Sequence, residues 1–403
     1  MSRLRATTAG LVAAAVAVAF VGGCGAPSKN GTKSAAASSV PDKPKNPVTL
    51  NILDIAGNLA LTKGMIEDFI KANPDVVKNV TYTKAPAPSM SGKLQAQQAA
   101  GRVSINLVLT GTDGLSAGIK NNLFVKVLPD YESRFPGLME NYQPPAAAMQ
   151  GLAQGQAIEV VYYPSGPLIE YSPSKVSSPP TTPAELLSWA KAHPGRFQYA
   201  DPANSGPGRT LLMGLPYLLG DKDPADPDKG WDKTWAYLKQ LGKYTKSYGS
   251  GTGETMRNLA AGSVDMVAST TGWDINPRVL GTVPNTVKVG LLQPMTWVTD
   301  AQYVAIPKGV SADVLAADLA LIKFMLQPKE QAIAYDDGYF FPGPAVRDVT
   351  IDMAPAKSQQ TIARFGRPEY EQWISQYEKK TPLPADKQVF AFDKWNKLIG
   401  SGG

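Results

Sequence analysis

Histidine and cysteine each occur once in this chain of 403 residues, as His193 and Cys24. The single cysteine excludes an intrachain disulfide and a zinc site built from several thiolates. The single histidine excludes a multi-histidine metal site. His193 directly precedes a proline, where a helix must stop, so we expect it to act as a cation near a helix C-terminus and not as a catalytic base. We predict no enzymatic activity, no metal site and no cofactor.

An excess of charge of one sign is also nearly absent. Lys and Arg number 40 against 34 Asp and Glu, and loss of an N-terminal segment containing Arg3 and Arg5 would lower the formal net charge from +6 to +4. The basic residues are scattered and form no cluster with interleaved aromatic residues. Nucleic-acid binding therefore has no support in the sequence.

Long apolar runs are missing as well, and the run over residues 9–21 is too short to span a hydrocarbon core of ~30 Å. Because Arg3 and Arg5 precede it, the layout is that of a secretory signal peptide. The following string VGGC, which ends at Cys24, is similar to the lipobox of bacterial lipoproteins, in which the cysteine is lipidated and the signal is cut before it. We predict a signal peptide over residues 1–23, lipidation of Cys24, and an extracytoplasmic protein anchored to the cell membrane. The alternative is cleavage at a nearby small residue, which would leave an idle thiol.

Gly, Ser, Ala, Pro and Lys dominate the segment that follows Cys24. Such a composition buries too little apolar surface to offset the chain entropy lost on folding. We therefore predict that residues 24–47 form a disordered tether.

From residue 48 onward, hydrophobic residues recur with periods of two and of about 3.6 in alternation, which is typical of α/β architecture. Residues 48–56 and 105–111 are predicted strands, and residues 60–72 and 312–326 are predicted helices. The length favours two domains. Two long strand-like segments, 157–172 and 297–307, are the predicted crossovers between them. The predicted lobes are 48–163 with 303–350, and 164–302 with 351–403, the C-terminal helices being assigned to the second lobe.

Two lobes joined by crossovers can hinge about a cleft, and ligands of open α/β sheets bind beyond the carboxyl ends of the strands. Loops that fit this position precede predicted helices, so that unpaired N–H groups should face the cleft. These loops are 56–58, 110–113, 204–208 and 250–253.

Several phrases, in this order, resemble the solute-binding lipoproteins of bacterial ABC importers. They are PTTPAELLSWAKAHPGRFQYADP, AAGSVDMVASTTGWDINP, AQYVAIPKGV and LALIKFMLQPKEQAIA. Their spacing is similar to the type II periplasmic-binding-protein group, especially the branch with polyamine, ferric-ion and thiamine binders. The resemblance covers about residues 48–400. It implies an α/β, two-lobed fold with a hinge, an interlobe ligand cleft, and delivery of a captured small molecule to membrane permease subunits.

The resemblance also implies where the solute is held. Trp273 and Asp274 loosely match the tryptophan-acid motif of polyamine binders, in which carboxylates clamp ammonium groups and aromatic faces pack against the chain. We predict that Asp113 and Asn58 oppose this pair, with Tyr303 near the second crossover. A cationic or zwitterionic solute is favoured. The complete set of predicted ligand-binding residues is Asn58, Thr112, Asp113, Ser205, Gly206, Arg209, Gly251, Thr252, Trp273, Asp274 and Tyr303.

Other solutes stay open at this point. The string NSGPGR offers N–H donors at a helix start together with Arg209, a cradle suited to phosphate or carboxylate. Ferric-ion binders use adjacent tyrosines, and Tyr162 and Tyr163 invite that comparison. They lie on the predicted first crossover, where we expect them to serve packing.

Two other classes of function compete with transport. A secreted hydrolase would need a nucleophile with a base, and a structural or adhesive surface lipoprotein would need an apolar partner patch and no hinge. We favour a monomeric solute-binding protein that delivers its solute to an ABC permease.

Overall fold

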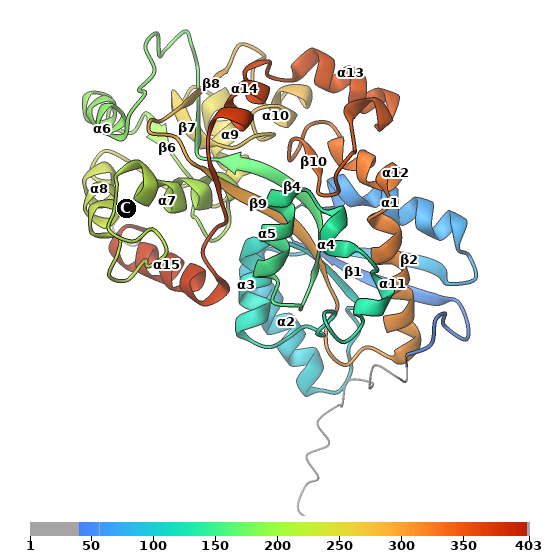
Figure 1. Ribbon diagram of the computed structural model, residues 1–403. Coiled ribbons are helices and arrows are strands. Elements are labelled where there is room, and N and C mark those ends of the chain that lie inside the picture. The colour runs from blue at the N-terminus through green and yellow to red at the C-terminus, as the bar shows by residue number, and fades with distance from the viewer. Residues whose placement is uncertain (1–39, 56, 401–403) are drawn as a thin grey trace, which may run out of the picture.

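The computed structural model describes residues 40–55 and 57–400. Two β-sheets form the frame of the molecule (Figure 1). In the first sheet the order is β10-β4-β9-β3-β1-β2, and β11 pairs with β9. Strands β1, β2 and β3 run parallel, whereas β9 is antiparallel to both β3 and β4. The strands of this sheet are β1 (Val48–Asp54), β2 (Val77–Lys84), β3 (Leu107–Gly111), β4 (Ile158–Gly166), β9 (Trp297–Ala305), β10 (Gly343–Pro344) and β11 (Lys379–Lys380).

The second sheet is smaller and has the order β6-β7-β5-β8. Strand β6 is parallel to β7, and β5 is antiparallel to both of its neighbours. Its strands are β5 (Leu168–Tyr171), β6 (Phe197–Gln198), β7 (Met266–Ser269) and β8 (Lys288–Leu291). Strand β6 has only two residues, because the chain turns over residues 199–205 toward the next helix.

Helices that precede β5 in the chain, together with α11 and α12, surround the first sheet, and α1 packs beside α11. Helix α1 ends at Ala72, the predicted end, and Asn73 follows it as the C-cap. The Ser311 hydroxyl caps α11 by accepting from the Val314 N–H. These helices are α1 (Leu59–Ala72), α2 (Ala87–Ala99), α3 (Thr112–Lys120), α4 (Leu138–Asn141), α5 (Pro144–Leu152), α11 (Ala312–Met325) and α12 (Pro328–Gln331). The 3₁₀ turns nearby are η2 (Glu132–Arg134), η3 (Ala332–Tyr335) and η4 (Ile351–Met353).

The remaining helices accompany the second sheet. Thr182 caps α6, and His193 follows the end of that helix, where its ring stacks on Trp189 at a centroid distance of 4.6 Å. The last helix, α15, supplies Trp395 to the second core and also lies beside α3 of the first sheet (Figure 1). These helices are α6 (Pro183–Ala192), α7 (Gly206–Leu218), α8 (Asp232–Gly242), α9 (Thr252–Ala260), α10 (Asn276–Val279), α13 (Ala356–Phe365), α14 (Glu369–Gln376) and α15 (Ala385–Leu398).

Two strands carry the chain between the sheets (Figure 1). Strand β4 ends at Gly166, and β5 of the second sheet begins at Leu168. Strand β9 starts with Trp297 and Val298, which pack in cores of the second sheet, and continues to Tyr303 and Val304, which pack in the core of the first. The molecule has the two-lobed α/β fold that the sequence predicted.

Part of the predicted tether is ordered against the first sheet. Val40 is buried in the first core, and Arg134 donates to the carbonyl oxygens of Val40 and Pro41 at 3.2 and 3.1 Å. Lys43 forms an ion pair with Asp75 at 2.8 Å. The prediction of disorder was wrong for residues 40–47, because one apolar side chain and several charges find partners that composition does not reveal. The predicted signal peptide and Cys24 lie outside the described residues.

No helix in the described ranges combines the length and apolar character that a membrane crossing requires.

Candidate functional site

A cavity of about 180 Å³ lies where the two lobes meet. The first lobe contributes Asp113 from the start of α3, and β4 and β9 contribute one side chain each. The second lobe contributes the loop before α7, the start of α9 and the segment after β7. The residues that line the cavity are Asp113, Tyr163, Asn204, Gly206, Arg209, Thr252, Trp273, Gln302, Tyr339 and Phe340.

Helix starts determine where these side chains lie. Strand β3 ends at Gly111, and α3 begins directly at Thr112, so Asp113 stands in the first helical turn. Across the cavity, the Ser205 hydroxyl caps α7 by accepting from the Gly208 N–H at 3.2 Å. The same hydroxyl shares a hydrogen bond of 2.7 Å with Thr252 at the start of α9. The N-terminal ends of α7 and α9 are thereby tied together beside the cavity.

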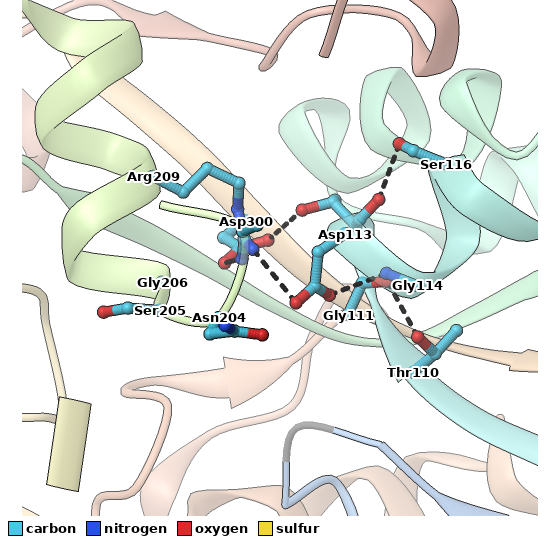
Figure 2. A network of polar contacts seen from close by, with 12 residues as sticks. Thr110, Gly111, Asp113, Gly114, Ser116, Asn204, Ser205, Gly206, Arg209 and Asp300 are labelled. Carbon is cyan, nitrogen blue, oxygen red and sulfur yellow. Dashed lines mark hydrogen bonds and ion pairs between the residues drawn. The ribbon is translucent and has the colours of Figure 1, made fainter. Parts of the chain in front are cut away.

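The central charged group is Arg209, which is buried and reaches toward two carboxylates (Figure 2). Its Nη2 donates to Asp300 Oδ2 at 2.5 Å. Asp300 also accepts hydrogen bonds from the Tyr163 hydroxyl at 2.7 Å, the Thr112 hydroxyl at 2.9 Å and the Ala301 N–H at 3.0 Å. Burial lowers the pKa of Arg209, but the neighbouring carboxylates outweigh burial and hold that pKa above its ordinary value. Asp300 is therefore fully committed to protein donors.

Asp113 is less committed than Asp300. Its Oδ1 accepts from the Gly114 N–H at 2.8 Å, whereas its Oδ2 lies 3.6 Å from Arg209 Nη1. That separation gives an ion pair but is too long for a hydrogen bond. Burial raises the pKa of the Asp113 carboxyl, and the charge of Arg209 partly offsets this rise. The Asp113 carboxylate is thus buried at the cavity wall, and Arg209 does not come within hydrogen-bonding distance of its Oδ2.

Aromatic rings form a continuous wall on the other side. Tyr163 stacks on Phe340 with centroids 4.7 Å apart, Phe340 neighbours Tyr339 at 4.4 Å, and Tyr339 neighbours Trp273 at 5.2 Å. Gly272 adopts a φ of 101°, and a Cβ there would lie 2.4 Å from the Tyr339 carbonyl oxygen. The close approach at this glycine lets the segment with Tyr339 and Phe340 rest on the second lobe.

Residues 64–361 match the family model described as bacterial extracellular solute-binding protein. The chain belongs to this family. Its members are extracellular, which places this solute-binding protein outside the cytoplasm.

Solved structures share the fold at low sequence identity. The periplasmic binding protein AfuA from Actinobacillus pleuropneumoniae, with fructose-6-phosphate bound, is 14% identical with a TM-score of 0.62, covering 87% of this chain and 98% of its own. A periplasmic thiamin binding protein is 17% identical with a TM-score of 0.63, covering 89% and 99%. The spermidine/putrescine ABC transporter substrate-binding protein PotD from Streptococcus pneumoniae is 15% identical with a TM-score of 0.55, covering 86% and 99%. No curated protein sequence matches significantly.

The structure brings several predicted residues of the solute-binding protein together. Asp113, Gly206, Arg209, Thr252 and Trp273 line the cavity. Thr112, Ser205 and Gly251 stand directly behind this wall. Thr112 and Ser205 are hydrogen-bonded to Asp300 and Thr252, and Gly251 is the residue before α9.

Asp274 was predicted to bind the solute beside Trp273, but the structure places its side chain elsewhere. Its side chain is fully buried and does not line the cavity. The carboxylate accepts from Arg367 Nε at 2.7 Å and from the Tyr370 hydroxyl at 2.5 Å, and it lies 3.5 Å from Arg278 Nη2. The neighbouring Trp273 does face the cavity. Adjacent side chains in this turn point to different environments, so the pair does not act as one clamp.

Tyr303 and Asn58 were also predicted to bind the solute, and neither lines the cavity. The Tyr303 hydroxyl donates to the Met149 carbonyl at 2.8 Å in the core, while its neighbour Gln302 lines the cavity. The sequence therefore identified the right strand and the wrong face, because side chains alternate along β9. Asn58 is fully buried and accepts from the Thr62 hydroxyl at 3.0 Å. Tyr339 fills the space at this loop, since its hydroxyl would lie 2.7 Å from a Cβ at Gly57.

Sequence reasoning missed half of the cavity wall. Asn204 belongs to a loop that was predicted at the cleft, but Tyr163 was assigned to packing; the structure places its ring in the wall and its hydroxyl on Asp300. Gln302, Tyr339, Phe340 and the buried Asp300 carried no pattern that separates them from core residues. Within the described residues, no group of three or more His, Cys, Asp or Glu side chains is arranged to hold a metal ion.

Proposed function

We propose that this solute-binding protein serves an ABC importer and captures a small solute with a positively charged amino group, either a cation or a zwitterion, in the interlobe cavity. Closure of the two lobes about the solute would present it to permease subunits in the membrane. The proposal draws on the family membership, on the fold shared with ABC substrate-binding proteins, and on the charges that line the cavity.

The ion pair between Arg209 and Asp300 is the observation that favours a positively charged solute. Arg209 is one positive charge shared by two carboxylates, and its short contact of 2.5 Å goes to Asp300, while Asp113 lies 3.6 Å away. The three groups together therefore carry one excess negative charge on the side of Asp113. An ammonium group beside Asp113 Oδ2 would gain a charge-assisted hydrogen bond. The rings of Trp273, Tyr339 and Phe340 add faces to which a cation is attracted.

An anion would meet less favourable surroundings at this place. The start of α7 offers a partial positive charge, but Arg209 is already engaged and Asp113 would repel an anionic group nearby. In a zwitterion, the carboxylate end could take the side of Asn204 and Gly206, opposite Asp113 (Figure 2). A solute with both charges thus fits the two sides of the cavity.

A set of four-carbon compounds tests the charge preference. Putrescine, 4-aminobutyrate and succinate share their chain length and differ in charge, and isothermal calorimetry on the purified protein would compare them. We expect binding of putrescine or 4-aminobutyrate and none of succinate. Tight binding of succinate alone would refute the proposal. Mass spectrometry of small molecules released on denaturation would identify the natural solute independently.

We also propose that the mature protein begins at a lipidated Cys24 and acts as a monomer without catalysis. The support for lipidation is the lone cysteine after a short apolar segment. Cys24→Ala should move the protein from the membrane fraction to the medium or periplasm, as followed by immunoblotting. A variant that stays with the membrane and has its N-terminus elsewhere would contradict lipidation.

Ser116 lies in a Gly-Leu-Ser-Ala-Gly string, the pattern found around a hydrolase nucleophile. Ser116 stands in α3, and its hydroxyl donates to the Thr112 carbonyl at 2.6 Å. A nucleophilic serine of a hydrolase elbow stands instead on a strained turn between strand and helix. His193, the one histidine, stands at the end of α6 against Trp189. These positions support binding without turnover.

A further inference from the structure

Gln302 presents an unused hydrogen-bond acceptor in the cavity wall. Its side chain is 1% exposed, and it lines the cavity from β9. Among the described residues, no donor is hydrogen-bonded to its Oε1. Buried polar atoms are almost always paired in native proteins, and an unpaired one costs free energy. An acceptor kept in this state at the wall of a ligand cavity points to a donor on the solute.

Gln302 and Asp113 converge on the same place. Gln302 is opposite Gly111 in the pairing of β3 with β9, and Asp113 follows Gly111 by two residues. A Cβ at Gly111 would lie 3.0 Å from Asp113 Oδ1 and 3.4 Å from Gln302 Nε2. Both side chains therefore flank the bare Cα of this glycine, and the amide stands beside the carboxylate at the cavity wall.

We propose that Gln302 Oε1 and Asp113 Oδ2 each accept one N–H from a single primary ammonium group of the solute, so that the cavity selects primary amines over fully N-methylated ones. This inference rests on the proposed function, because it assumes that a cationic group binds at Asp113. The bound cation must then carry at least two N–H donors, one for each acceptor. Gln302 is thereby a specificity-determining residue.

The aromatic rings and the Gln302 acceptor favour different solutes. A quaternary ammonium group is attracted to Trp273, Tyr339 and Phe340 as well as a primary one, and aromatic cages are a common site for it. If the rings alone chose the solute, methylation would be tolerated or favoured. A trimethylated nitrogen has no N–H, however, and Gln302 Oε1 would stay buried without a hydrogen-bond donor when it is bound. The two readings predict opposite preferences.

Matched pairs of compounds test the preference on the full mature chain. The pairs are 4-aminobutyrate with 4-(trimethylammonio)butyrate, and putrescine with its fully N-methylated form. We expect each primary amine to bind about tenfold or more tightly than its methylated partner, the ratio for one buried acceptor left unpaired. The inference would be overturned if the primary amine did not bind more tightly than its methylated partner in either pair.

Variants separate Gln302 from general effects of burial. Gln302→Leu should lower the affinity for the primary amine about tenfold and leave the methylated compound unchanged or tighter. Gln302→Glu keeps an acceptor and should retain the preference, which guards against a folding defect in the leucine variant. Gln388 on α15 is an equally buried glutamine, also without a partner for its Oε1 among the described residues, and it does not line the cavity. Gln388→Leu should leave both affinities unchanged.

The outcomes also distinguish this inference from the proposed function. Binding of amines without regard to methylation would remove the role of Gln302 and keep the cationic solute. Binding of succinate in place of every amine would remove both. A Gln302→Leu variant that keeps the full preference for primary amines would overturn the inference by itself.

Discussion

Two buried charge clusters of this molecule contain the same kinds of residues and serve different ends. In the second lobe, the Asp274 carboxylate accepts hydrogen bonds from Arg367 Nε and the Tyr370 hydroxyl. Arg278 donates to the carbonyl oxygens of Asp274 and Phe365. At the interlobe cavity, Arg209 is held by Asp300, and Asp113 Oδ2 stays 3.6 Å from the guanidinium. The first cluster is closed by protein donors, whereas the second has an acceptor to spare beside a cavity. The two clusters therefore differ in how completely protein donors satisfy their carboxylates and not in the kinds of residues they contain.

The closed cluster should matter most for stability. Asp274→Asn would leave the buried Arg278 and the partly buried Arg367 without their carboxylate, and breaking a buried ion pair from one side costs about 3–5 kcal/mol of unfolding free energy. Urea unfolding would measure this loss. Because Asp274 does not line the cavity, we expect unchanged solute affinity at temperatures where the variant is folded. Lost affinity with undiminished stability would return Asp274 to the binding site that the sequence predicted.

Glu170 sharpens the comparison through pH. Burial raises the pKa of this carboxyl to about 8, with Asp274 adding to the rise, and Ser269, Arg367 and Arg278 opposing it. The folded protein therefore keeps a proton that the unfolded chain releases near pH 4.5, and stability falls as pH rises from about 4.5 to about 8. The largest slope from this group is about 1.4 kcal/mol per pH unit.

Glu170→Gln should remove this dependence. We expect the variant to match the wild type near pH 4.5 and to gain on it steadily up to pH 8, as followed by chemical unfolding at a series of pH values. Identical pH profiles for the two proteins would show that Glu170 titrates normally. Solute affinity should be unaffected, because Glu170 stands in β5 and not in the cavity wall.

The open cluster should show the reverse pattern of effects. Asp113→Asn would remove the charge that holds an ammonium group and should weaken a cationic solute by about 1.5–3 kcal/mol, the range of a hydrogen bond to a charged group. Stability should change little, because an asparagine oxygen can still accept from the Gly114 N–H. Calorimetric titration and thermal unfolding of the same sample would test both statements. Unchanged affinity together with a large loss in Arg209→Ala would instead indicate an anion binder.

The pattern of the chain was sufficient for the architecture. Alternating periods of two and 3.6 predicted strands and helices close to β1, β3, α1 and α11, and the resemblance of several phrases predicted the two-lobed fold. Such signals are local, because the period of a helix or strand is read from neighbouring residues. They also located the loops at Asp113, Arg209 and Thr252, since a loop between strand and helix has a defined place at the edge of a sheet.

Sequence by itself determined several of the segments that reach the cavity. Tertiary structure added the segment with Tyr339 and Phe340 and decided which side chains face the cavity. Gln302 and Tyr303 are neighbours in β9, yet one lines the cavity and the other the core, because the pairing with β3 and β4 sets the face. Asp274 was lost to the site because Arg367, 93 residues away in the chain, folds back onto it. Asp300 joins Thr112 and Arg209 across similarly long separations. A carboxylate is free for a ligand only where no such distant donor arrives, and that depends on the whole fold.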